Sequence, residues 1–165
     1  MIYTGNYKNC LKGNLVSISG DRGKKENFSG MCFPVLAPRL SFWKEWHNNI
    51  GKISEEENNY FYIKNYYNLV LKSLDPKEIV NLFDKGTIFL CYEENYEFCH
   101  RHIVAYWLEK ELGIKVPEIK IDKFGNVTIL ERPKWIKEML DNIIKEERKQ
   151  EKHFVKKIIN KIEGV

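Results

Sequence analysis

One segment of the chain concentrates side chains that can do chemistry. Residues 87–112 bring together two thiols, an acid, two imidazoles and a guanidinium, at Cys91, Cys99, Glu93, His100, His102 and Arg101. An apolar run, TIFLCY, precedes most of these residues, and a helical pattern follows them. In α/β proteins the loop between a buried strand and the next helix often carries functional residues. We therefore expect the functional site at this turn.

Glu93 is the expected catalytic acid or base, because it directly follows the end of a buried strand. Partial burial would raise its pKa into the range that is useful for proton transfer. We expect His100 to take part in catalysis by orienting Glu93 or the substrate. The alternative for Glu93 is a solvated loop acid, which is the role we expect for Glu94 and Glu97.

The helix that opens near Cys99 favours an anion-binding site. Its first turn offers unpaired backbone N–H groups and a partial positive charge. Arg101 adds a fixed cation that can donate two parallel hydrogen bonds, so we expect it to bind a phosphate or carboxylate of the substrate. The alternative is that Arg101 pairs with Glu93 or Asp21 and only braces the loop.

Cys99 is expected to contact the substrate. Its place at a helix N-terminus beside His100 is of the kind that lowers a thiol pKa and makes a nucleophile. The alternative is a small buried hydrophobic residue, the role we expect for Cys91. We expect no metal and no cofactor. Cys91, Cys99, His100 and His102 include no C-x-x-C pair, and adjacent Cys and His side chains diverge on a helix.

A second polar segment, GDRGKK at residues 20–25, follows a predicted strand at 14–19. It lacks the residue order of a P-loop. Because both segments follow strands, we expect it to face the same edge of the sheet as the Cys99 turn. Asp21 is then a second catalytic candidate and Arg22 a second anion ligand. A solvated turn is the alternative.

The pattern of the chain predicts an α/β fold. The run TIFLCY is typical of a strand buried on both faces at the centre of a parallel sheet. We expect a three-layer sandwich with a mostly parallel sheet of four or five strands, plus a C-terminal hairpin and a long helix. The expected strands are 2–4, 14–19, 87–92, 114–116, 118–121 and 127–130. The expected helices are 40–49, 55–74, 75–84, 99–112 and 135–162, with a long loop at 20–39.

The run LCYEENYEFCHRHIVAYWL resembles the hallmark of domain of unknown function (DUF) family 488, a strand ending Cys-x-Glu and a helix opening Cys-His-Arg. Its positions here are Cys91, Glu93, Cys99, His100 and Arg101. MIYTGNY and LVSISGDRG resemble the first two strands of that family, although the family's acid usually lies within the strand. The resemblance implies an α/β domain at 1–121. Residues 122–165 would then be a hairpin strand and a helical extension packed on it.

Composition sets broad limits. The chain has 165 residues, 43% hydrophobic, which fits one folded domain. Its net charge of +4 is compatible with a nucleotide or nucleic acid but does not by itself indicate one. No apolar run approaches the roughly 20 residues of a membrane helix, and MIYTGNYKNC does not resemble a signal peptide. We expect a cytoplasmic protein with free thiols and no membrane partner, and leave the oligomeric state open.

Three functions fit these residues. The first is a small enzyme that acts on a phosphate-bearing nucleotide or nucleic acid, by hydrolytic or N-glycosidic cleavage with Glu93 as acid or base. The second is a non-catalytic module that binds nucleic acid or protein through the same turn. The third is a thiol-based redox or transfer enzyme that uses Cys99. Some aromatic residues of the first two helices could stack on bases, but we expect most of them to belong to the core. They are Phe42, Trp43, Trp46, Tyr60, Tyr62, Tyr66 and Tyr67.

Overall fold

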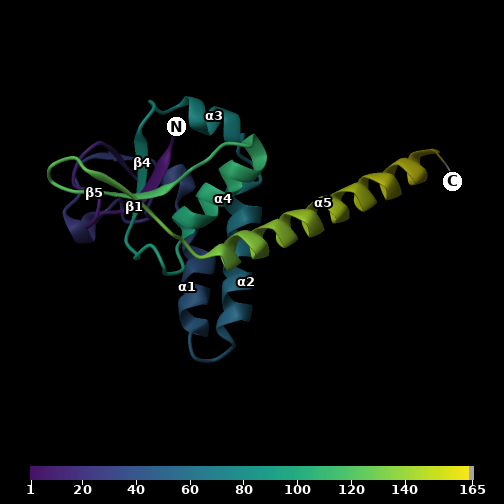
Figure 1. Cartoon of the computed structure of the whole chain (residues 1–165). Coiled ribbons are helices and arrows are strands. Elements are labelled where there is room, and N and C mark those ends of the chain that lie inside the picture. Colours follow the sequence, from purple (N-terminus) through teal and green to yellow (C-terminus); the bar gives the residue numbers. More distant parts are fainter. Residues whose placement is uncertain (164–165) are drawn as a thin grey trace.

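The computed structural model describes residues 1–163, and the last two residues of the expected extension lie outside the described part. The chain forms an α/β fold around a six-stranded sheet of order β3-β2-β4-β1-β5-β6 (Figure 1). The strands are parallel except for β6, which runs antiparallel to β5. They span β1 Tyr3–Asn6, β2 Asn14–Ser17, β3 Met31–Cys32, β4 Thr87–Cys91, β5 Glu118–Ile121 and β6 Val127–Leu130.

This arrangement confirms the expected α/β fold, mostly parallel sheet, hairpin and long terminal helix. The parallel part of the sheet has five strands, and one of them, β3, forms within the predicted loop 20–39. The α-helices are α1 Leu40–Asn49, α2 Glu55–Tyr66, α3 Pro76–Asn81, α4 His100–Leu112 and α5 Lys134–Glu163. A π-helical turn, Tyr67–Leu71, continues α2 within the helix predicted at 55–74.

Local sequence signals explain where several helices begin and end. The Asp75 side chain accepts hydrogen bonds from the first turn of α3, and Pro76 occupies its first position, where no N–H is needed. Ser54 and Glu57 form a capping box at the start of α2. Gly113 ends α4 in the left-handed conformation with φ 64°.

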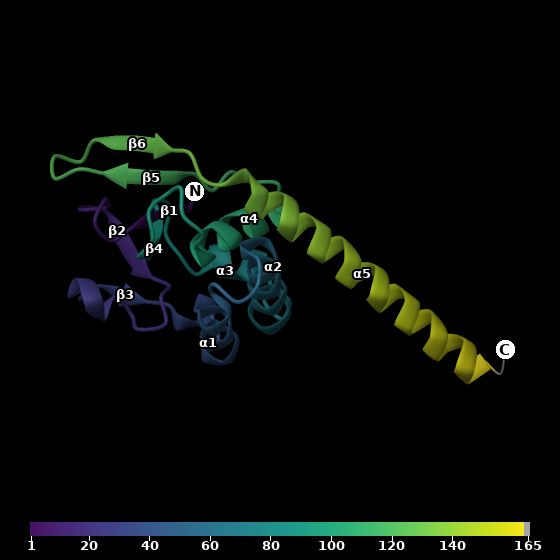
Figure 2. The same cartoon turned by 90° about the horizontal axis from the view of Figure 1, so that it is seen from below.

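The central strand β4 is buried along its whole length, as the run TIFLCY predicts. Phe89 points into the main core, which the helices cover (Figure 2). Ile88 and Leu90 point to the opposite face, where a smaller apolar cluster includes Tyr7 and Phe28. The alternation follows from the two-residue period of a strand.

The predicted strand at 114–116 is wrong. That segment has no regular structure, and β5 begins only at Glu118, after Pro117. The backbone groups of Val116 explain the difference. Its N–H donates to the carboxylate of Glu109, and its carbonyl accepts from Arg132. These groups are therefore not available to a β-ladder.

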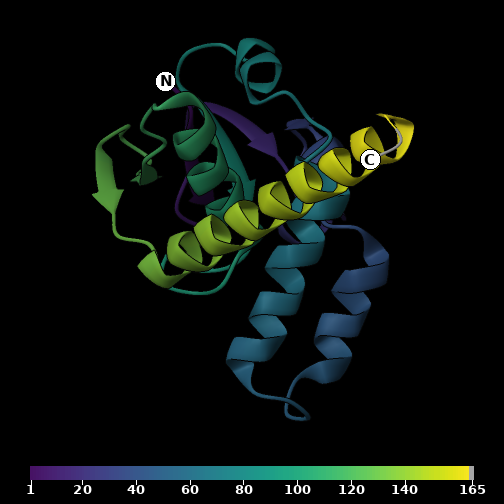
Figure 3. The same ribbon diagram turned by 90° about the vertical axis from the view of Figure 1, so that its right-hand side faces the viewer.

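Helix α5 divides into two parts. Its first part lies across α4 and α2 (Figure 3) and buries Ile136, Leu140, Ile143 and Ile144. The second part extends beyond the domain and exposes Phe154, Val155, Ile158, Ile159 and Ile162. Among residues 1–163, no helix has an apolar stretch that would span a bilayer.

A buried charged network joins α4 to the sheet. The guanidinium of Arg101 contacts the Glu118 carboxylate, with 3.1 Å from Nε and 3.1 Å from Nη2 to Oε1. Thr4 in β1 donates its hydroxyl to Oε2 of Glu118 at 2.6 Å. The side chains of Arg101 and Glu118 are 0% and 1% exposed. The network therefore fixes the first turn of α4 against β1 and β5.

Replacing Ile143 by Ala should lower the free energy of unfolding by about 2–5 kcal/mol, because it leaves a cavity where α5 packs on the domain. The matched variant Ile158→Ala, on the exposed part of the same helix, should change it by less than about 0.5 kcal/mol. Urea denaturation followed by circular dichroism measures both. Equal losses in the two variants would contradict the division of α5.

Replacing Glu118 by Gln should cost about 3–5 kcal/mol of stability, because it leaves the charge of Arg101 buried and unmatched. Glu111→Gln serves as the control, since Glu111 pairs with the half-exposed Arg148 near the surface. It should cost less than about 1 kcal/mol. A Glu118→Gln protein as stable as the control in urea denaturation would show that the network does not brace the fold.

Candidate functional site

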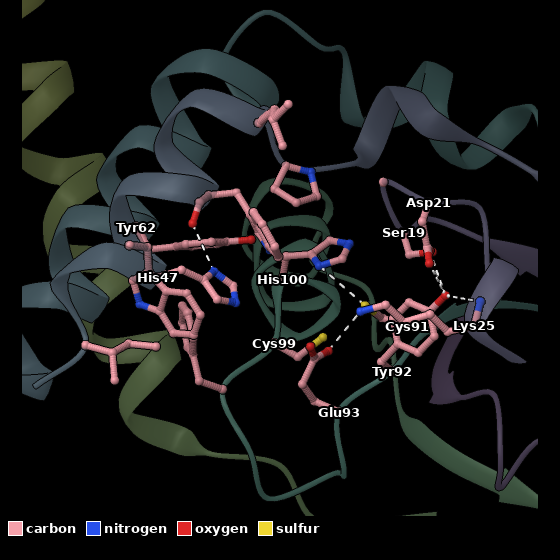
Figure 4. Close-up of a pocket in the computed structure, with 17 residues that line it drawn as sticks. Ser19, Asp21, Lys25, His47, Tyr62, Cys91, Tyr92, Glu93, Cys99 and His100 are labelled. Atoms are coloured by element: carbon pink, nitrogen blue, oxygen red, sulfur yellow. Dashed lines mark hydrogen bonds between the residues drawn. The ribbon is translucent and has the colours of Figure 1, made fainter.

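A cavity of about 720 Å³ opens at the carboxyl ends of β2 and β4. The β4–α4 turn forms its floor with Cys91, Glu93, Cys99 and His100, and the segment after β2 contributes Asp21. Figure 4 shows Cys99, Glu93 and His100 between Tyr62 and His47 on one side and Asp21 and Tyr92 on the other. The structure thus brings the two sequence segments to one edge of the sheet. Ligands of open α/β sheets bind at this kind of edge.

Two thiols and an imidazole converge on one point of this cavity. The Sγ atoms of Cys91 and Cys99 and a ring nitrogen of His100 all lie within 4.8 Å of one another. Cys91 ends β4, and Cys99 is the N-cap of α4, with extended backbone angles of φ −150° and ψ 144°. Because Cys99 stands just before the helix, its side chain does not diverge from that of His100. The expectation that the two side chains diverge is wrong.

The hydrogen bonds of these residues define the site further. The Cys91 thiol donates to Oε2 of Glu93 at 3.3 Å, and its sulfur lies 3.6 Å from Nδ1 of His100. The other ring nitrogen of His100, Nε2, lies 3.0 Å from the carbonyl of Ile18. A carbonyl oxygen can only accept, so Nε2 carries a hydrogen and Nδ1 faces the thiols.

The environment of the turn shifts the pKa values of its thiols in opposite directions. Burial raises the pKa of Cys91 well above its ordinary value. Burial alone would also raise the pKa of Cys99, but the neighbouring thiol of Cys91, the charge of Arg101 and the ring of His100 hold it well below that value. The proton therefore resides on Cys91, and Cys99 is the better anion of the two.

The two carboxyl groups of the cavity also differ. Burial raises the pKa of Glu93 to about 7, and the charge of Cys99 acts in the same direction. Burial opposes ionisation of Asp21, but hydrogen bonds from Tyr92 and Ser19 outweigh it and lower its pKa. The Tyr92 hydroxyl lies 2.6 Å from both Asp21 oxygens. At neutral pH Asp21 is therefore ionised, whereas Glu93 can exchange a proton.

The two arginines expected to bind an anion do not line the cavity. The side chain of Arg101 is fully buried and paired with Glu118, and its Nη1 lies 4.0 Å from Oε2 of Glu93. Arg101 therefore braces the turn, which was the alternative to anion binding, but its partner is Glu118 and not Glu93 or Asp21. Its positive charge also lies near Cys99. Arg22 is exposed, with a positive φ of 62°.

Several residues of the cavity wall are not among the predicted site residues. Lys25 contributes from the segment after β2, and aromatic side chains contribute from other elements: Trp43 and Trp46 from α1, Tyr62 from α2 and Phe98 from the turn. Trp46, Tyr62 and Phe98 contact one another with ring centroids 5.0–5.5 Å apart. The spacing of Trp43, Trp46 and His47 on one face of α1 is the sequence signal for this wall.

Comparison with known proteins gives one match. A family model described as "Active DUF488-N3 subclade" (DUF488-N3a) matches residues 14–112. No curated protein and no solved structure matches the chain. The matched segment runs from β2 through α4 and includes Asp21, the β4–α4 turn and the aromatic wall. It covers more than half of the chain, and the chain therefore belongs to the DUF488 family.

Proposed function

We propose that the protein is a small enzyme that cleaves a nucleotide or nucleic acid hydrolytically, with Glu93 as general acid or base. One observation carries the proposal. A single cavity combines an aromatic wall with a carboxyl group at the end of a central strand. Its volume, about 720 Å³, lies within the range of typical small-molecule sites.

The wall supports a planar, aromatic substrate. Trp43, Trp46, Tyr62 and Phe98 line the cavity, and such side chains bind nucleobases by stacking, whatever the base. Apolar walls with a few convergent polar groups are characteristic of ligand sites. A nucleobase would stack here, with its sugar directed toward Glu93 and Asp21.

The anion of the substrate would bind at the polar side of the cavity. Lys25 lines that side, and the first turn of α4 directs its partial positive charge to the same edge. Arg22 and Arg101, the arginines predicted for this task, are not needed for it. Lys25 and the first turn of α4 therefore replace them in the proposal.

The two acids support bond cleavage. Glu93 is partly shielded, with its side chain 41% exposed, and it opens on the cavity where a water molecule can enter. A carboxyl group in that position can deprotonate the water or protonate the leaving group. The ionised Asp21 can stabilise positive charge that develops on a sugar ring. We propose cleavage at an N-glycosidic or a phosphate-linked centre.

Replacing Glu93 by Gln should lower kcat at least about 100-fold, because the amide cannot exchange a proton, while the dissociation constant of the substrate should change little. Glu97→Gln is the control, since Glu97 lies in the same loop but does not line the cavity. A chromatographic screen of nucleosides, nucleotides and single-stranded oligonucleotides first identifies the substrate. Full turnover by Glu93→Gln would contradict the mechanism, and binding without turnover by the unmodified chain would favour the non-catalytic module.

Replacing Trp43 by Ala should weaken binding of the identified nucleotide about 10- to 100-fold, because each stacked base contributes about 1–3 kcal/mol. Tyr96→Ala removes an aromatic ring that is 72% exposed and lies outside the cavity, so it should leave affinity unchanged. Isothermal titration calorimetry measures both. Equal affinities of the two variants would exclude stacking on Trp43.

A further inference from the structure

We propose that Cys91, Cys99 and His100 bind one Zn²⁺ ion, with the fourth coordination position open to the cavity. The catalytic use of this ion rests on the proposed function, but binding of the ion does not. Zinc sites with two thiolates, one imidazole and an open position are of the catalytic kind. The ligand set lies on the floor of the cavity, next to Glu93 (Figure 4).

The distances fit the ion. With bonds of roughly 2.3 Å to sulfur and 2.1 Å to nitrogen, a tetrahedral Zn²⁺ holds a thiolate and an imidazole about 3.6 Å apart. The Sγ of Cys91 and Nδ1 of His100 lie 3.6 Å apart. All three ligand atoms lie within 4.8 Å of one another, so small side-chain rotations close the site around one centre.

The surroundings of His100 are those of a metal ligand. Its Nε2 lies 3.0 Å from the carbonyl of Ile18, which accepts the ring hydrogen. Metal-bound histidines commonly donate their second ring nitrogen to a carbonyl or carboxylate, and this bond fixes the orientation of the ring. Nδ1 is then the ring nitrogen on the side of the two thiols, and it is the one that would bind the ion after losing any proton it carries.

The charges near the site also match a divalent cation. Binding would remove the protons of both thiols and leave two thiolates, which Zn²⁺ neutralises. Two adjacent buried thiolates without a cation would be strongly disfavoured.

Glu93 gives the open position a chemical use. Its Oε2 lies 3.3 Å from the sulfur of Cys91, and Glu93 lines the cavity onto which the fourth position opens. When bound, the ion would lower the pKa of a water at that position, and Glu93 would accept the proton of this water as it attacks the substrate. The bond to the leaving group breaks, and the leaving group takes the proton that Glu93 has held.

Cobalt titration tests the site without reference to activity. The full chain, freed of metal with a chelator, should bind one Co²⁺ per molecule and develop the absorption of tetrahedral cobalt and of thiolate-to-cobalt charge transfer. Equimolar Zn²⁺ should abolish these bands. The variants Cys91→Ser, Cys99→Ser and His100→Ala should each lose at least about 100-fold in affinity. Cys10→Ser and Cys32→Ser, which alter cysteines outside the ligand set, should bind as the unmodified chain does.

A second measurement needs no variant, in case a ligand variant does not fold. Zn²⁺ should protect Cys99, which lines the cavity, but not Cys32, from alkylation by N-ethylmaleimide, as mapped by mass spectrometry. Any of three results would overturn the proposal. The chain could show no cobalt bands, the bands could persist in folded Cys99→Ser, or Cys99 could be alkylated equally with and without Zn²⁺.

The two proposals fail separately. Glu93→Gln should bind Co²⁺ as the unmodified chain does, because Glu93 is not one of the three ligands. A chain that binds Co²⁺ through the three ligands but cleaves no nucleotide or nucleic acid upholds the metal site and overturns the proposed function. If the cobalt titration gives no bands and the metal-free protein still cleaves its substrate, the function is upheld and the metal site is overturned.

Discussion

The buried ion pair between Arg101 and Glu118 is the constraint on which the site depends. It joins α4 to β5, and the hydroxyl of Thr4 extends it to β1. Burying two charges is expensive, and the pair is stable because the two charges neutralise each other and the Glu118 carboxylate accepts hydrogen bonds from Arg101 and Thr4. Arg101 directly follows His100, the first residue of α4, so the pair also fixes the position of the first turn of this helix. The same guanidinium lowers the pKa of Cys99.

The convergence at the turn follows from this constraint and from ordinary strand geometry. Cys91 ends a strand that is buried on both faces, so its thiol is already directed into the protein at the cavity edge. The extended backbone of Cys99 turns the second thiol toward the first, and His100 follows as the first residue of the helix. The two thiols and the imidazole thus meet because the start of α4, which the ion pair anchors, faces the end of β4.

Much of the fold and part of the site could be predicted from the sequence because their signals are local. The apolar run of β4, the Asp75-Pro76 start of α3 and Gly113 each act within a few residues. The partner of Arg101 could not be predicted, because Glu118 lies on another strand and no local pattern links them. The aromatic wall could not be predicted either. The sequence pattern of Trp43 and Trp46 on α1 is that of core residues, and only the tertiary structure shows that they line a cavity.

Amide hydrogen exchange at the start of α4 tests this dependence most directly. The N–H of His102 donates to the carbonyl of Cys99 at 3.1 Å and so reports whether the first turn holds. In Glu118→Gln this amide should exchange at least about tenfold faster than in the unmodified chain, beyond any change in the amides of α2. Unchanged protection of His102, relative to α2, would contradict the view that the buried pair positions the site.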